Sequence, residues 1–105
     1  MPAIRQFTGL LAAAAMLPAA AFAQDANLGR NLAATCANCH GTNGNARGDM
    51  KPLAGVSAAR IVAQLADFKN NVGAPTIMHQ IARGYTDAQV QAQAAIFEAQ
   101  KLAAK

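Results

Sequence analysis

The sequence predicts an all-α fold of about four helices, and three observations carry this prediction. Apolar residues recur three and four positions apart, as in Ile61, Leu65 and Phe68. Glycine, proline and asparagine separate the periodic segments, and Thr86 opens one of them with a strong helix-start pattern. No stretch after residue 24 alternates apolar and polar residues as a half-buried strand does.

The first 23 residues have the pattern of an export signal. Arg5 supplies a positive charge, residues 7–17 are uncharged and mostly apolar, and Ala21-Phe22-Ala23 is a small-x-small cleavage site. A retained membrane anchor is the alternative, but the apolar run is short for a span and meets Pro18. We therefore expect a signal peptide at 1–23, periplasmic location, one mature domain at 24–105, and no stable membrane insertion after cleavage.

The elements of the mature part follow from local signals. The first helix is expected to begin after Asp25 and to run into the cysteine pair. Residues 41–56 are rich in glycine and predict a long loop, a kind of segment that is usually functional or wrapped around something. Ser57 is a favourable N-cap for a second helix that ends near residues 70–73.

Two more helices complete the prediction. Pro75 precedes a short third helix, and Gly84 is expected to stop it as the residue after the C-cap. The final helix has the clearest start, because Thr86 and Gln89 form a capping box and Asp87 lies favourably in the first turn. Its expected apolar face comprises Val90, Ala94, Phe97 and Leu102.

The charge pattern limits the kinds of partner. Loss of Arg5 with the leader leaves eight of the nine Lys and Arg residues against five Asp and Glu, a formal charge of +3. These basic residues are scattered, with almost no aromatic residues among them, so nucleic-acid binding is not expected. A mild positive charge can steer docking to an acidic face of a partner protein.

Both cysteines of the chain lie in C-A-N-C-H, residues 36–40. A disulfide, a redox pair or part of a zinc site are the alternatives for such spacing. Zinc would lack ligands, since only His79 and carboxylates remain, and a thioredoxin-like pair needs a mixed sheet. C-x-x-C-H is the signature of c-type haem attachment.

The spacing explains this chemistry. Residues three apart on a helical turn project side by side, so Cys36 and Cys39 are predicted to form thioethers with the two vinyl groups of one haem c. His40 then supplies the proximal imidazole ligand. The macrocycle would also supply bulk to a mature core that has no tryptophan and only Phe68 and Phe97 as phenylalanines.

A sixth iron ligand has three candidates in the mature part. Met50 lies only ten residues beyond the proximal histidine, whereas Met78 is 38 residues beyond it, with ample chain to reach the opposite face of the ring. Met78 is therefore predicted to be the distal ligand; the alternative is an ordinary core methionine. His79 is the rival ligand, or else an exposed helix residue facing away from Ile77 and Ile81. Methionine–histidine ligation suits electron transfer.

One residue beyond the ligands is predicted to contribute to the site. A ligating histidine usually donates its other ring N–H to a carbonyl or carboxylate. Pro52, in the stretch P-L-A-G, is placed to offer its backbone carbonyl. The alternative is that this proline only shapes the loop.

These features together resemble the class I c-type cytochromes over essentially all of the mature part. The attachment motif, P-L-A-G, a lone distal methionine and G-Y-T-D-A-Q before the last helix occur in that order. The resemblance implies the cytochrome c fold wrapped around one covalent haem c, a Pro52 carbonyl that accepts the histidine N–H, and a close crossing of the first and last helices where Gly29 faces Phe97.

More narrowly, C-A-N-C-H-G-T-N-G and T-I-M-H-Q-I-A-R-G-Y-T-D resemble the cytochrome subunit of flavocytochrome c sulfide dehydrogenase and the cytochrome c4 group. This resemblance implies a periplasmic monohaem carrier of single electrons, free or as the electron-accepting subunit beside a flavoprotein that oxidises sulfide. No catalytic residue of its own is then expected. The alternative is a haem enzyme or gas sensor with an open sixth coordination position.

Overall fold

The computed structural model describes residues 26–103, which form five α-helices and one 3-10 turn without any β-strand. The all-α prediction is confirmed, with five helices in place of about four. The expected signal peptide, residues 1–23, lies outside the described residues. None of the helices within residues 26–103 has the length and hydropathy that a bilayer span requires.

The expected first helix is divided into two short ones. Helix α1 spans Leu28–Ala34 and α2 spans Ala37–His40. Between them the backbone tightens to bonds between residues three apart, because the N–H of Thr35 donates to Leu32 (3.3 Å) and that of Cys36 to Ala33 (3.0 Å). The 3-10 turn η1, Thr42–Gly44, follows directly and begins the long loop.

Helix α3, Ala58–Lys69, starts and ends where the sequence predicts. The Ser57 hydroxyl accepts the backbone N–H of Arg60 at 3.2 Å, which makes Ser57 the N-cap. Asn70 is the C-cap. Local signals therefore determine both ends of this helix.

Helix α4, Ile77–Ala82, begins after the N-cap Thr76. Its C-cap is Arg83, so the predicted stop is correct in position. Gly84 donates its N–H to the carbonyl of Ile81 at 3.0 Å but does not adopt the positive φ expected of a glycine in a left-handed cap.

Helix α5, Asp87–Glu98, begins with the predicted capping box of Thr86 and Gln89. Its extension to Leu102 is wrong, because α5 ends at Glu98 and Leu102 is exposed in the tail. The N–H of Gly55 donates to the carbonyl of Phe97 at 2.9 Å and satisfies a group that a longer helix would use internally.

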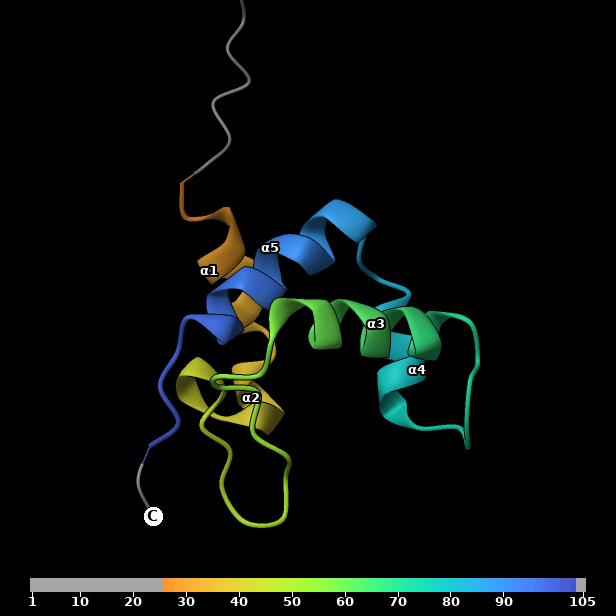
Figure 1. The fold of residues 1–105 in the computed structure, drawn as a ribbon. Helices are drawn as coiled ribbons and strands as arrows, with labels where there is room; N and C mark the ends of the chain where they lie inside the picture. The colour runs from red at the N-terminus through yellow and green to blue at the C-terminus, as the bar shows by residue number, and fades with distance from the viewer. Residues whose placement is uncertain (1–25, 104–105) are drawn as a thin grey trace, which may run out of the picture.

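The helices pack in a chain of contacts, α1 on α5, α5 on α3 and α3 on α4. Figure 1 shows α5 between α1 and α3, with α4 below one end of α3. The central cluster of buried residues consists of Ala33, Ile61, Ala94 and Phe97. Half of this cluster is alanine, so the described helices bury little apolar bulk on their own.

The predicted close crossing of α1 and α5 is present, but with different partners for Gly29. A Cβ at Gly29 would lie 2.9 Å from the carbonyl oxygen of Ala92 and 3.1 Å from Cγ1 of Ile96. Phe97 instead covers Gly44, where an added Cβ would lie 2.9 Å from its ring. Neighbouring helix positions point about 100° apart, so the face that meets Gly29 is one residue removed from the face that carries Phe97.

Candidate functional site

The residues of the C-A-N-C-H motif lie on a single helical turn. Cys36 is the N-cap of α2, and Cys39 and His40 belong to the helix itself. Cys36 is half-buried against the central cluster, whereas Cys39 is exposed. Both thiols are free, so the alternative of a disulfide between them is not realised.

The two thiols have different surroundings. Burial raises the pKa of the Cys36 thiol, and the hydroxyl of Thr35, 4.0 Å from its sulfur, opposes part of this effect. Before any thioether forms, the Cys36 thiol therefore stays protonated at neutral pH. The Cys39 thiol is the more exposed of the two.

The imidazole of His40 is oriented by the loop that follows the motif. Its Nδ1 lies 2.9 Å from the backbone carbonyl of Lys51. Because a carbonyl only accepts hydrogen bonds, Nδ1 carries the proton, and the lone pair of Nε2 is left for a metal. This is the tautomer that a proximal ligand requires.

The predicted acceptor, the carbonyl of Pro52, is therefore wrong by one residue. A residue before proline is biased to extended backbone, where successive carbonyls point to opposite sides. Pro52 thus favours the conformation in which Lys51 faces His40. The proline itself lines a hollow beside the motif, so a role for Pro52 in holding a cofactor stays a prediction.

That hollow, of about 740 Å³, lies between the motif and the loop. Its lining includes Cys39, Met50, Pro52 and Leu102, but neither His40 nor Met78. Met50 thus lies in the loop on the Cys39 side of the motif, and the hollow is not a space shared by the two predicted iron ligands.

Met78 lies in the first turn of α4 and is half-buried. Within residues 26–103, α2 and α4 make no contact with each other. Figure 1 shows them apart, toward opposite ends of α3. The fold therefore presents the two predicted ligands from separate elements, without bringing them into direct contact.

His79 is a correction to the sequence analysis. It is only 6% exposed, and so is not the exposed helix residue that was one alternative, while Ile77 is 73% exposed. The N–H of Thr76 donates to Nδ1 of His79 at 3.0 Å, and Nε2 donates to the carbonyl of Val72 at 2.9 Å. Both ring nitrogens of His79 are thus engaged in hydrogen bonds, so neither nitrogen is available to bind a metal.

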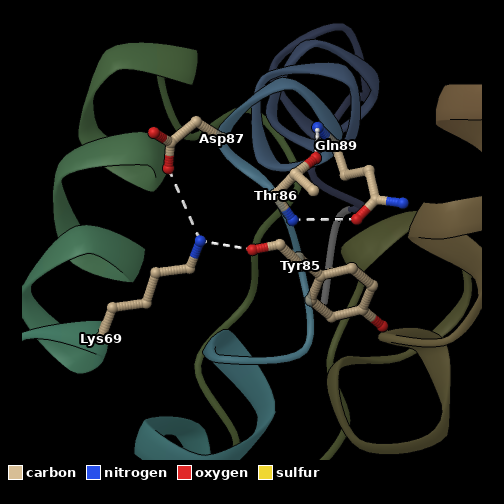
Figure 2. Close-up of polar contacts among 5 residues, drawn as sticks. All are labelled: Lys69, Tyr85, Thr86, Asp87 and Gln89. Atoms are coloured by element: carbon tan, nitrogen blue, oxygen red, sulfur yellow. Dashed lines mark hydrogen bonds and ion pairs between the residues drawn. The ribbon is translucent and has the colours of Figure 1, made fainter.

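A second set of contacts near the motif was missed by the sequence analysis. The hydroxyl of Thr35, next to Cys36, lies 2.8 Å from that of Tyr85, the chain's single tyrosine. Lys69 donates to the carbonyl of Tyr85 and lies 3.5 Å from Asp87 (Figure 2). These contacts join the start of the motif, the end of α3 and the turn before α5. The only feature of the sequence that could have indicated these contacts was the presence of a single tyrosine.

The residues present fit a covalently attached haem. Two free thiols and an imidazole with an available Nε2 lie within one turn, and a thioether lies on a separate helix. The small core leaves apolar bulk to be supplied, and several apolar side chains remain uncovered. Within the described residues these are Leu28, Met50, Val72, Ile77, Ile81 and Leu102.

Comparison with known proteins finds a matching family model and two relatives. A family model described as Cytochrome c matches residues 26–104. The cytochrome subunit of sulfide dehydrogenase from Chlorobaculum tepidum is 38% identical over 69 residues, which are 66% of this chain and 63% of that protein. Cytochrome c-552 from Acidithiobacillus ferridurans is 40% identical over 60 residues, 57% of this chain. The match covers 26% of that second relative, so the chain spans only part of both.

Proposed function

The chain belongs to the cytochrome c family, and on this premise we propose that it is a single-haem electron carrier with the iron held between His40 and Met78. The family implies a covalently bound haem c and a role in electron transfer. In the proposal, thioethers from Cys36 and Cys39 hold the group. When bound, the haem supplies an iron that accepts and returns one electron.

The observation that carries the proposal is the hydrogen bond between Nδ1 of His40 and the carbonyl of Lys51, at 2.9 Å. It fixes the ring orientation and the tautomer, and it increases the basicity of the nitrogen left for the metal. An electron carrier must keep its ligands in place in both oxidation states. A ring tied to backbone meets this need better than one tied to a mobile side chain.

In the proposal the thioether of Met78 would supply the second protein ligand of the iron. Methionine–histidine ligation raises the reduction potential and occupies the position at which small molecules would react. This ligation distinguishes a carrier from the alternative, a haem enzyme or gas sensor with an open sixth position.

We also propose that residues 1–23 direct export to the periplasm, where the domain of residues 24–105 works. The similarity to a cytochrome subunit of sulfide dehydrogenase supports a flavin-bearing partner subunit as electron donor. Copurification of the native protein with a flavoprotein would support this partner. Isolation of the haem protein alone under gentle conditions would favour a free carrier.

A reductive titration tests the proposed function. The purified haem protein is expected to take up one electron per chain and to bind carbon monoxide only weakly, because Met78 occupies the sixth position. Tight, immediate binding of carbon monoxide to the reduced protein would contradict the carrier and support the open-site alternative. Mass spectrometry of the same sample should show one attached haem and a chain that starts at Gln24.

A further inference from the structure

His79 is one of two buried polar side chains in the part of the chain that the structure describes; the other is Gln93. Unlike Gln93, it directly follows the proposed ligand Met78. Its ring contacts three separate segments: the N-cap Thr76, the loop residue Val72 and the end of α3 at Phe68. The Phe68 and His79 rings meet edge to face, with centroids 5.0 Å apart.

Apart from His79, no side chain in the first turn of α4 is buried. The helix has six residues, which is too short to be stable without tertiary contacts. The residues buried on α4 are His79 and Ala82, and Ile77 at its start is 73% exposed. The loop before α4 is exposed from residue 70 to residue 76. The imidazole is therefore the main buried contact at the end of α4 that carries Met78.

The hydrogen bonds give this imidazole a defined role. The carbonyl of Val72 only accepts, so Nε2 carries the proton, and Nδ1 accepts the N–H of Thr76. The side-chain hydroxyl of Thr76 in turn accepts the backbone N–H of Met78 at 3.2 Å. Thus the backbone position of Met78 is fixed through Thr76, and Thr76 is fixed through His79.

We propose that His79 is a positioning residue that keeps the Met78 thioether on the iron against competing ligands. This inference rests on the ligand set of the proposed function. In this role His79 never binds iron. It joins the loop, the N-cap and α3 so that the methionine has one position, and loss of these contacts lets the first turn of α4 move and the sixth position open.

Helix α5 offers a matched control. In its capping box the N–H of Thr86 donates to the Gln89 side chain at 2.9 Å, as that of Thr76 does to His79, and the Thr86 hydroxyl accepts the N–H of Gln89 at 3.1 Å. No proposed ligand lies beside this box. If His79 only caps a helix, its removal should resemble the removal of Gln89. If it positions Met78, its removal should act on the iron site as well.

The experiment measures the affinity of imidazole for the ferric, haem-loaded protein in His79→Ala, His79→Gln and Gln89→Ala, together with the urea stability of each variant. His79→Ala is expected to bind imidazole about tenfold more tightly than wild type. A tenfold ratio corresponds to the free energy that is lost with one helix cap and its adjoining hydrogen bond. Gln89→Ala should lose stability but keep the wild-type affinity. His79→Gln should lie between, because glutamine rebuilds the box but not the contact with Phe68.

Equal imidazole affinity in His79→Ala and Gln89→Ala would overturn the inference. If His79→Ala does not fold, the comparison of His79→Gln with Gln89→Ala decides in the same way. Failure of the proposed ligand set has a different signature, because the ferric spectrum of the wild type would then lack the weak methionine-sulfur band at its red end.

Discussion

Helices α4 and α5 both begin with a capping box, but they differ in length and in the number of residues that they bury. Each has a threonine N-cap and a residue three positions later that returns a bond to the N-cap backbone: His79 after Thr76, and Gln89 after Thr86. Yet α5 has twelve residues, and α4 has six. The residues that α5 buries are Val90, Gln93, Ala94 and Phe97.

The difference shows how one local motif can serve two purposes. Beneath α5 the core determines the position of the helix, and the capping box adds stability to it. At the start of α4 the second residue of the box is itself buried, so the cap and the packing of the first turn depend on one side chain. We therefore expect changes in α5 to alter global stability, and changes at the start of α4 to alter the iron site.

The largest effect is expected in the core beneath α5. Phe97 is 3% exposed, and Phe97→Ala should lower the free energy of unfolding by about 3–5 kcal/mol through lost burial and a cavity. Urea unfolding of the haem-loaded protein measures this loss. Gln91→Ala, on the exposed face of α5, is the control. A loss at Phe97 no larger than at Gln91 would show that the core does not hold α5.

The crossing of α1 and α5 should be the next most sensitive. In Gly29→Ala the new methyl group meets the backbone of Ala92, which cannot move aside as a flexible side chain can. Overpacking of this kind costs about 1–3 kcal/mol, and the better helix propensity of alanine offsets about 1 kcal/mol of it.

Denaturation in urea, with Asn31→Ala on the exposed side of α1 as a control, measures the net cost at Gly29. If Gly29→Ala were more stable than wild type, the two helices would have to be further apart than the structure places them.

Matched changes to the two N-caps separate the roles most sharply. Thr76→Val and Thr86→Val each remove a hydroxyl that accepts a backbone N–H, and each should cost about 1 kcal/mol of stability. Only Thr76→Val should also raise the affinity of the ferric protein for imidazole. A titration followed by absorbance gives this affinity, and an equal rise in both variants would remove the distinction between α4 and α5.

The smallest effect is expected at the ion pair between Lys69 and Asp87 in Figure 2. The Asp87 side chain is 97% exposed, so the pair is screened by solvent and salt. Asp87→Asn should cost about 0.5 kcal/mol or less at physiological salt, and the difference should shrink as salt is added. A larger, salt-independent cost would mean that Asp87 supports α5 in another way.

The sequence predicts those features that depend on neighbours along the chain. Ser57 and Thr86 were recognisable as N-caps because their partners are three residues away. The start of α4 follows the same rule, but histidine at the third position is not the Glu or Gln that the capping box calls for. Its burial was also hidden, since it depends on how the loop folds back to place Val72 beneath the ring.

The relative positions of the motif residues were predictable from their spacing along the chain. Cys36, Cys39 and His40 lie on one turn, as the spacing implies. The hydrogen-bond partner of His40 was not, because the choice between Lys51 and Pro52 depends on which way a carbonyl points in an irregular loop. Tertiary contacts of this kind leave no periodic trace in the sequence.

The most direct test of the account compares ferric optical spectra of the wild type, Met78→Ala and Met50→Ala. If the iron is held between His40 and Met78, the wild type and Met50→Ala show the methionine-sulfur band and Met78→Ala does not. Persistence of the band in Met78→Ala, with its loss in Met50→Ala, would contradict the account and place the sixth ligand in the loop.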